Sequence, residues 1–317
     1  MSDPADAMPP ADGSATERLE AALAHVPALR PGPREVVALR GGLTNDTFKV
    51  TTPDRTVVVR LSTVGNDLLA IDRAAEHVNS VRAAESGAAP AVVAYLPEDR
   101  ALVVQWVDGR ALTPHDLADQ AMLTRVAAVA RLLHSGPRFE GDLDLAAVQD
   151  RYLRTVRQHG LRLPPRYLEL LPRVADVLRV VAVGAGPTVP CHNDLVAANI
   201  VDDGSRLWLV DHEFSANNDA MFDLGNLWQE ADLPEGHLEH LVTAYLGRPS
   251  RRQLARARLL GLTARFVWTL WASIQQEAGH TGPDVWSRAI ARYEVAVAEL
   301  DGPDLGGWLR LAAQAEP

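Results

Sequence analysis

Two neighbouring stretches decide the fold of this chain: Cys191–Asn199, which reads CHNDLVAAN, and Leu207–Asp211, which reads LWLVD. They place an aspartate, an asparagine and a second aspartate in the order that phosphoryl transfer requires. The first carboxylate, Asp194, can accept the proton of a hydroxyl nucleophile. The side chains of Asn199 and Asp211 can hold Mg²⁺ against the phosphates of a nucleotide.

The residues between these side chains predict a β-hairpin. Ile200–Val201 and Leu207–Val210 read as two short strands around the polar turn Asp202–Ser205. Such a hairpin sets Asn199 and Asp211 at neighbouring strand ends, close enough to share one metal ion. The alternative is a plain hairpin with solvated acidic residues, since Asp and Asn are frequent near turns.

Length and composition are compatible with a two-lobed enzyme. The chain has 317 residues, enough for two domains or lobes that each have a core. Its net charge of -10 disfavours nucleic acid as a partner and favours cationic small molecules. Cys191 is the single cysteine, which rules out an intramolecular disulfide and a cysteine-rich zinc site. A reducing cytoplasm is compatible with this cysteine usage.

The start of the chain and its hydropathy predict no membrane anchor. No apolar run approaches the ~20 residues of a membrane-spanning helix, and no signal peptide opens the chain. We therefore expect a cytoplasmic protein. Residues 1–13 consist mostly of Pro, Ala and Asp and predict a disordered tail.

The first third of the chain predicts mainly sheet. Ser14–Glu17 is a capping box, which predicts a helix to about His25. A second helix is predicted over about Asp67–Ser86, and from Leu112 onward the pattern is helical except for the hairpin. The predicted strands are Glu35–Arg40, Asp46–Thr52, Thr56–Ser62, Ala91–Tyr95 and Ala101–Val107.

This order of elements is the layout of a protein-kinase-like fold. Six motifs stand along it, Gly41–Asn45, Val57–Arg60, Cys191–Asn199, Asp211–Phe214, Phe222–Asn226 and Phe266–Gln275. In these motifs the chain resembles choline and ethanolamine kinases, which share that fold with aminoglycoside phosphotransferases. The resemblance implies an α+β protein with a small antiparallel-sheet N-lobe at 14–106 and a mostly helical C-lobe at 107–317.

For the nucleotide, the resemblance implies a phosphate loop in the first of these motifs. Gly42 lets the backbone turn tightly and present N–H groups to phosphate oxygens, and Thr44 and Asn45 complete the motif. The alternative is a plain hairpin turn. Arg60 shares a strand face with Val58, where a cation can meet the α- and β-phosphates of ATP; the alternative is a solvated arginine at a strand end.

A carboxylate in the helix after that strand can fix Arg60. Glu76 is the expected partner, as in the Lys–Glu ion pair of protein kinases. Asp72, one helical turn earlier, is the rival, but its side chain is shorter and is expected to face solvent. Gln105–Val107 lies where the lobes join, and the resemblance implies that its backbone meets the adenine edge.

In the catalytic loop we expect Asp194 to be the base that orients the substrate hydroxyl and takes its proton late. Asn199 and Asp211 are the expected ligands of Mg²⁺, which prefers oxygen atoms and keeps several waters. His192 is expected to hold the loop backbone by hydrogen bonds, a catalytic histidine being the alternative. Asp223 is expected to brace the loop.

The amine site is expected on a late helix. Trp268 and Trp271 stand three positions apart, so both indoles project from one helix face. Quaternary ammonium groups bind against such rings, although by spacing alone two core tryptophans are the commoner case. The resemblance implies that both line the amine site, with Glu230 facing the cation. Phe214 stands where relatives often have Tyr, so it keeps the ring and loses a hydroxyl.

Three classes of function follow. The first is an ATP- and Mg²⁺-dependent kinase that phosphorylates a small cationic alcohol, choline or ethanolamine. The second is an aminoglycoside or thiamine phosphotransferase of the same fold, which the paired tryptophans disfavour. The third is a nucleotide-binding pseudokinase, which the intact set of expected catalytic residues disfavours. The sequence leaves open the physiological amine, the oligomeric state and the pathway served.

Overall fold

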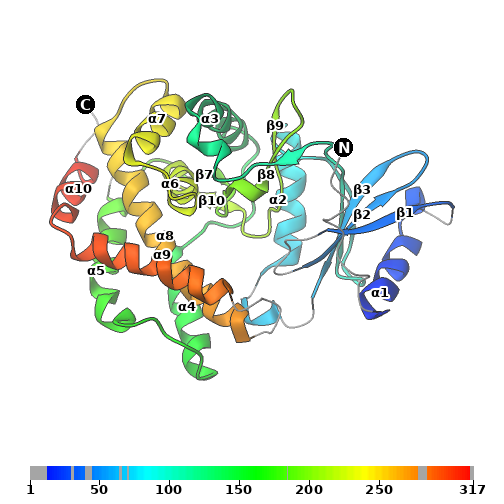
Figure 1. Cartoon of the computed structure of the whole chain (residues 1–317), viewed down its shortest axis with the longest axis horizontal. Coiled ribbons are helices and arrows are strands. Elements are labelled where there is room, and N and C mark those ends of the chain that lie inside the picture. Colours follow the sequence, from blue (N-terminus) through cyan, green and yellow to red (C-terminus); the bar gives the residue numbers. More distant parts are fainter. Residues whose placement is uncertain are drawn as a thin grey trace.

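A computed structural model describes residues 13–29, 32–39, 45–63, 66–69, 71–183, 185–277 and 284–314. An antiparallel sheet with α1 lies at one end of the molecule, most of the helices lie at the other, and α2 lies between them (Figure 1). The α+β, protein-kinase-like architecture is confirmed. Of the tail predicted over 1–13, only Gly13 is among the described residues, and it begins α1 (Gly13–Ala24).

The sheet has five antiparallel strands in the order β1-β2-β3-β5-β4. In its centre, Val59 of β3 lies opposite Phe48 of β2 and Val103 of β5. All five predicted strands are present, and the last ends two residues before the predicted Val107. The strands are β1 (Glu35–Leu39), β2 (Asn45–Thr51), β3 (Thr56–Ser62), β4 (Val92–Leu96) and β5 (Ala101–Gln105).

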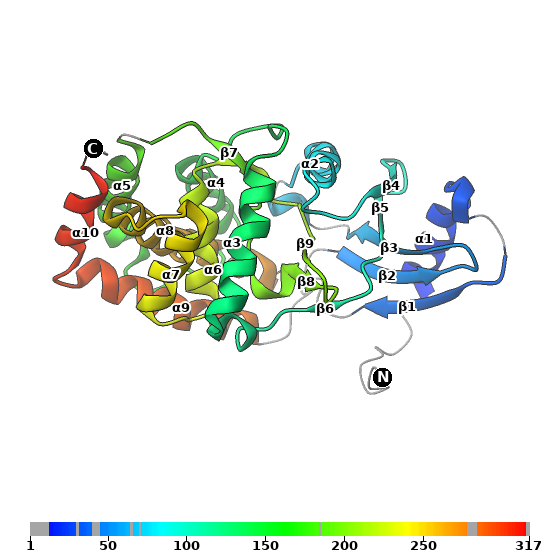
Figure 2. The same cartoon turned by 90° about the horizontal axis from the view of Figure 1, so that it is seen from above.

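Alternation along β3 gives the sheet two different faces. Val57, Val59 and Leu61 are fully buried and join a core with Leu19 and Leu23 of α1, which lies against the sheet in Figure 2. Successive side chains of a strand point to opposite faces. The residues between them, among them the predicted phosphate ligand of this strand, therefore point away from α1 and toward the rest of the molecule.

The helix that follows this strand begins later than predicted. A 3-10 turn at Asn66–Leu69 precedes α2 (Arg73–Glu85), so the prediction of one helix over Asp67–Ser86 was wrong at its start. Asp72 is the N-cap: its carboxylate accepts the backbone N–H groups of Ala74 and Ala75, both at 3.0 Å. A capping aspartate satisfies N–H groups that the first turn leaves without partners, and this sets where the helix begins.

Short strands carry the predicted hairpin. β8 (Ile200–Asp202) and β9 (Leu207–Leu209) pair antiparallel, as predicted, and β6 (Arg110–Ala111) extends them to a three-stranded sheet. A second small sheet joins β7 (Val189–Cys191) and β10 (Ala216–Asn218) on either side of the hairpin in sequence. The chain therefore enters and leaves the catalytic region through paired strands, which fix its position against the helices.

The remaining described elements are helical. Within the described part of the chain, no helix is both long and apolar enough to cross a membrane. The 3-10 helices other than the turn before α2 are η2 (Pro27–Leu29), η4 (Asp116–Ala118) and η5 (Ala197–Asn199). The α-helices are α3 (Gln120–His134), α4 (Leu145–Gln158), α5 (Tyr167–Ala182), α6 (Ala220–Glu230), α7 (Glu235–Leu246), α8 (Arg251–Glu277), α9 (Asp284–Asp301) and α10 (Leu305–Ala312).

Helix α8 is the centre of this helical lobe. It is 27 residues long, and it packs against α6 so closely that the two backbones touch at glycines. A Cβ added to Gly225 would lie 2.0 Å from the carbonyl oxygen of Ala257, and one added to Gly261 would lie 2.6 Å from that of Gly225. This crossing sets the spacing between the two helices that carry the predicted amine site.

Candidate active site

Two neighbouring cavities share part of their walls at the catalytic loop and the hairpin. The sheet-side cavity, of about 380 Å³, is lined by Val58 and Arg60 of β3 and by the segment after β5. The helix-side cavity, of about 350 Å³, is lined by the catalytic loop and by α8 and α9. Residues lining both cavities are Ala198, Asn199 and Asp211. A ligand in one cavity can therefore meet a ligand in the other.

The hairpin places the two predicted metal ligands side by side, as expected. The backbone N–H of Val210 donates to the carbonyl oxygen of Asn199 at 3.0 Å. Asp211 follows with φ of 69°, in the left-handed region that few non-glycine residues adopt. Such a conformation costs free energy and is held only where its surroundings demand it. Here it bends the chain so that the Asp211 side chain borders both cavities.

The catalytic loop is braced by a buried carboxylate, Asp223 of α6. Its two oxygens accept the backbone N–H groups of His192 at 2.7 Å and Asn193 at 2.8 Å. Nε2 of His134 on α3 also contacts Asp223, at 3.0 Å. The bracing predicted for Asp223 is confirmed. These hydrogen bonds fix Asn193, whose φ is 62°, and so set the position of Asp194 after it.

His192 has a structural position. Its ring Nε2 lies 2.8 Å from the carbonyl oxygen of Val210, which ties the catalytic loop to the end of the hairpin. The side chain is fully buried and is absent from the walls of both cavities. The prediction that it holds the loop backbone is confirmed.

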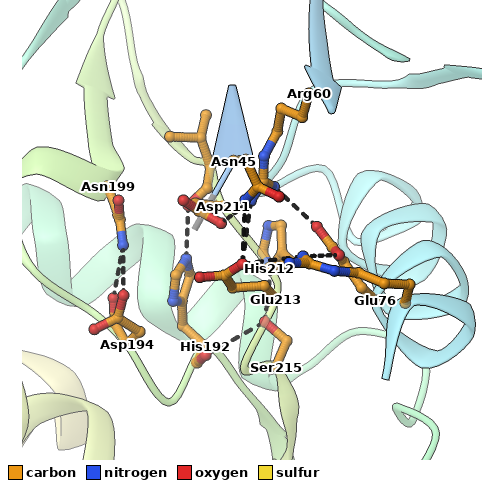
Figure 3. A network of polar contacts seen from close by, with 12 residues as sticks. Asn45, Arg60, Glu76, His192, Asp194, Asn199, Asp211, His212, Glu213 and Ser215 are labelled. Atoms are coloured by element: carbon orange, nitrogen blue, oxygen red, sulfur yellow. Dashed lines mark hydrogen bonds and ion pairs between the residues drawn. The ribbon is translucent and has the colours of Figure 1, made fainter. Parts of the chain in front are cut away.

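Asp194 lies in the helix-side cavity with its carboxylate held by Asn199. The side-chain amide of Asn199 donates to the carbonyl oxygen of Asp194 at 3.0 Å and to Oδ2 at 3.1 Å (Figure 3). Removal from water raises the pKa of Asp194 well above its usual value, and the charges of Asp211, Glu230 and Glu213 raise it further. A carboxylate with a raised pKa is a stronger proton acceptor when it is ionised.

Arg60 sits at the centre of a charged network that joins the sheet to the hairpin (Figure 3). Its guanidinium lies 3.0 Å from Oε1 of Glu76, forms an ion pair with Asp211 and lies 3.7 Å from Glu213. Burial by itself would lower the pKa of Arg60, but these carboxylates raise it above its usual value. The predicted Arg60–Glu76 pair is confirmed, and the rival Asp72 is exposed, as expected.

The sequence did not predict two members of this network, Arg73 and Glu213. Nη1 of Arg73 lies 2.7 Å from Glu76 and 3.0 Å from Glu213. Arg73 and Glu76 stand three residues apart on one helix, and this spacing could have predicted their ion pair from the sequence. Asn45 donates to Glu213 at 3.2 Å. Burial, and then the charge of Asp211, raise the pKa of Glu213 to about 7, against the opposing effect of the arginines.

The oxygen atoms at the junction of the cavities fit a magnesium ion. The amide nitrogen of Asn199 is committed to Asp194, so the atom that remains to bind a cation is its oxygen. The carboxylate of Asp211 borders the same two cavities. Mg²⁺ takes oxygen ligands, commonly one or two from the protein together with phosphate and water oxygens. The donor set therefore suits Mg²⁺.

The segment predicted to meet adenine lines the sheet-side cavity. Gln105, Trp106 and Val107 all border it, as does Arg60. The ring of Trp106 is held from β2 by Lys49, whose Nζ lies 4.2 Å from the ring centroid. The predicted phosphate-loop residues Gly42 and Thr44 lie outside the described residues.

The helix-side cavity brings together the predicted amine-site residues. Trp268 and Trp271 of α8 border it, and each also packs against the helical core. Each side chain is therefore partly a core residue and partly a residue of the cavity wall. Phe214 lines the cavity next to Trp268, with ring centroids 5.4 Å apart. Asp194 borders the same cavity. A cation seated on the rings and a hydroxyl at Asp194 can belong to one small molecule.

Glu230 also lines this cavity, but it has a partner that the sequence did not predict. Nη1 of Arg292 on α9 lies 2.6 Å from its Oε2. Burial raises the pKa of Glu230, while Arg292, and then Arg265, lower it. No local pattern could have shown this contact, because Arg292 lies 62 residues further along the chain.

The chain matches the sequence model of the phosphotransferase enzyme family over residues 35–260. It is 30% identical over 119 residues to the protein LicA of Haemophilus influenzae, a match that covers 35% of this chain and only 43% of LicA. It is 25% identical to ethanolamine kinase 2 of Mus musculus, covering 75% of this chain and 68% of that one.

Among solved structures, the fold is similar to a choline/ethanolamine kinase family protein from Mesorhizobium loti. The TM-score is 0.81 at 28% identity, and the superposition covers 95% of this chain and 100% of the other. The similarity therefore includes the sheet, the catalytic loop and α8, the helix that carries Trp268 and Trp271.

Proposed function

This chain belongs to the phosphotransferase enzyme family, and from that premise we propose that it transfers the γ-phosphoryl group of ATP to the hydroxyl of a small cationic amino alcohol. Choline is the first candidate and ethanolamine the second. The observation that carries the proposal is the helix-side cavity, where Trp268, Trp271 and Asp194 border one space. The similarity to ethanolamine and choline/ethanolamine kinases supports the same class of acceptor.

The nucleotide is proposed to occupy the sheet-side cavity. Its adenine would lie against the backbone of Gln105–Val107, and its phosphates would extend to Arg60, with Glu76 holding the guanidinium in place. Asn45 would contribute at the end of the phosphate loop, together with Gly42 and Thr44. The charged network supports this assignment because it fixes a cation at the wall of the cavity.

The phosphates and the acceptor would meet where the cavities join. Asn199 and Asp211 would hold Mg²⁺, which neutralises the charge that develops on the transferred phosphoryl group. Asp194 would accept a hydrogen bond from the acceptor hydroxyl, orient its oxygen for in-line attack and take its proton late. Asn199 would keep the Asp194 carboxylate in that orientation through its amide.

The acceptor cation would lie against the aromatic rings. Trp268 and Trp271 would each contribute roughly 0.5–2 kcal/mol through attraction between the cation and the ring. Phe214 would complete the site with apolar contact. Methyl groups on the nitrogen bury more apolar surface, so choline should bind more tightly than ethanolamine.

Three broader statements belong to the same proposal. The chain would divide into an N-lobe at 14–106 and a C-lobe at 107–317, linked by the segment after β5. It would depend on ATP and Mg²⁺. It would act in the cytoplasm, with which its single cysteine is compatible.

A comparison of acceptors tests the proposal. ATP consumption would be measured with Mg²⁺ and either choline, ethanolamine, thiamine or kanamycin, at several acceptor concentrations. We expect saturable ATP consumption with choline and, at higher KM, with ethanolamine. ATP consumption with kanamycin or thiamine, but with neither choline nor ethanolamine, would show that the chain is an aminoglycoside or thiamine phosphotransferase. Consumption with none of the four, in a protein that binds ATP, would support the pseudokinase alternative.

A further inference from the structure

In the helix-side cavity, the carboxylate of Glu230 is already paired with an arginine of the protein. Nη1 of Arg292 lies 2.6 Å from Oε2 of Glu230, and Nη2 of Arg292 donates to the backbone oxygen of Glu230 at 3.0 Å. The Glu230 side chain is 19% exposed and that of Arg292 is 36% exposed. The carboxylate expected to face the substrate cation is thus already neutralised by a cation of the protein.

Two further arginines lie along the same wall. Arg265 of α8 and Arg288 of α9 also line the cavity with Arg292. Arg265 is buried, donates to the backbone oxygen of Gln229 and lies 2.8 Å from Asp232. The carboxylates of Glu230 and Asp232 on this side are therefore both paired with arginines, whereas Asp194, Asp211 and Glu213 bring negative charge to the rest of the cavity lining.

We propose that Arg292 is a specificity-determining residue. It forms a neutral ion pair with Glu230, so that the positive charge of the acceptor is recognised by the rings of Trp268 and Trp271. The inference rests on the proposed function and narrows its substrate class to alcohols with a single cationic group. One ammonium group can lie against Trp268 and Trp271 without displacing Arg292.

A second ammonium group meets a different environment. Beside this wall it would meet Arg265 and Arg292, each of which is already paired with a carboxylate. Glu230 and Asp232 are then not available to stabilise its charge, and withholding a counter-charge from the wrong ligand is one source of specificity. The arrangement therefore disfavours aminoglycosides, because their additional ammonium groups find no counter-charge at this wall.

The test is a double-mutant cycle read with two acceptors. One is choline, and the other is 3,3-dimethylbutan-1-ol, in which a carbon atom replaces the quaternary nitrogen and removes the charge while keeping the shape. KM for each acceptor, KM for ATP and kcat would be measured for Glu230→Gln, Arg292→Gln and the double variant. The melting temperature of each variant would be recorded, and Arg292→Met would replace any Arg292→Gln protein that does not fold.

Glu230→Gln leaves the guanidinium of Arg292 uncompensated. KM for choline should then rise by about tenfold or more, because an unpaired charge near the cation is poorly screened in a partly buried site. KM for the neutral alcohol should hardly change. In the double variant the cavity is again neutral at this point, and KM for choline should return to within about threefold of the wild-type value.

A double variant that keeps the whole loss of Glu230→Gln would overturn the inference, because Glu230 would then attract the substrate directly. Arg173→Gln is the matched control: it removes another arginine that holds α9, through Asp301 at 2.6 Å, but that does not line the cavity. It should leave KM for choline unchanged. An equal rise in this control would mean that the position of α9, and not charge, sets the KM.

Failure of this inference is distinguishable from failure of the proposed function. A wild-type enzyme that uses neither choline nor ethanolamine refutes both. A wild-type enzyme that uses choline, together with an unrescued double variant, refutes only the role of Arg292.

Discussion

The side-chain amide of Asn199 donates to the Oδ2 atom of Asp194 at 3.1 Å, and to its backbone oxygen at 3.0 Å. The expected metal ligand and the expected base are therefore one hydrogen-bonded unit, held between the catalytic loop and the hairpin. The amide orientation also leaves the oxygen of Asn199 for a cation. A small displacement of either residue should therefore affect both metal binding and the acceptor hydroxyl.

Replacing Asp211 by alanine should weaken the binding of Mg·ATP by about tenfold or more, because it removes a charged metal ligand. Titration calorimetry with ATP in the presence and absence of Mg²⁺ measures this, and the loss should appear only with Mg²⁺. Asp54→Ala, in the exposed turn between β2 and β3, is the control and should bind as the wild type does. Equal binding of Mg·ATP by Asp211→Ala and by the wild type would show that Asp211 is not a metal ligand.

Glu76→Gln should raise KM for ATP by about fivefold or more and leave KM for the acceptor unchanged, since a hydrogen bond to a charged group contributes ~1.5–3 kcal/mol to holding Arg60 in place. Steady-state kinetics at varied ATP give the result. Asp72→Asn is the matched control, because asparagine also caps a helix and Asp72 is exposed. Should the Asp72 variant raise KM for ATP instead, the two carboxylates would have the opposite roles.

Trp271→Ala should raise KM for choline by roughly tenfold, from the loss of ~0.5–2 kcal/mol of cation–ring attraction and of ring contact. Ethanolamine, with less methyl surface, should lose less, and KM for ATP should hardly change. Trp208→Ala, in the hairpin and outside the helix-side cavity, is the control. An unchanged KM for choline in a Trp271→Ala protein with normal melting temperature would show that Trp271 is a core residue and does not bind the amine.

Gly225→Ala should destabilise the protein by about 1–3 kcal/mol, because the added methyl group would meet the backbone of α8. KM for choline should rise as well, since α6 carries Glu230 and α8 carries the tryptophans. Gly236→Ala, in α7 where a Cβ meets nothing within 4 Å, should be neutral or slightly stabilising. A Gly225→Ala protein with wild-type melting temperature and KM would show that the two helices can separate without cost.

Much of this architecture follows from local sequence. The hairpin between Asn199 and Asp211 was predictable because its apolar strands flank a turn rich in Asp and Gly, and the alternation on β3 placed Val58 and Arg60 on one face. The pairing of Arg60 with Glu76 was predictable from motif order. The start of α2 was not, because the same acidic residue can stand inside a first turn or cap it, and only the backbone at Asp72 decides.

The charges around the site were the least predictable part. Glu213 stands two residues after Asp211, yet its contacts with Arg60, Arg73 and Asn45 come from the sheet and from α2. Arg292 reaches Glu230 only because α9 packs against α8 (Figure 1). Such pairs depend on tertiary packing between distant segments, for which a single sequence carries no periodic signal.

The most direct test of the account is the product formed by the wild type and by Asp194→Asn. Wild-type enzyme with choline and Mg·ATP should give O-phosphocholine in equal amount to ADP, as measured by phosphorus NMR. Asp194→Asn should bind ATP almost normally and keep less than about a tenth of wild-type kcat, a loss above ~1.4 kcal/mol in transition-state stabilisation. A variant that keeps more than this, or a wild type that makes ADP without phosphorylating choline or ethanolamine, would contradict the account.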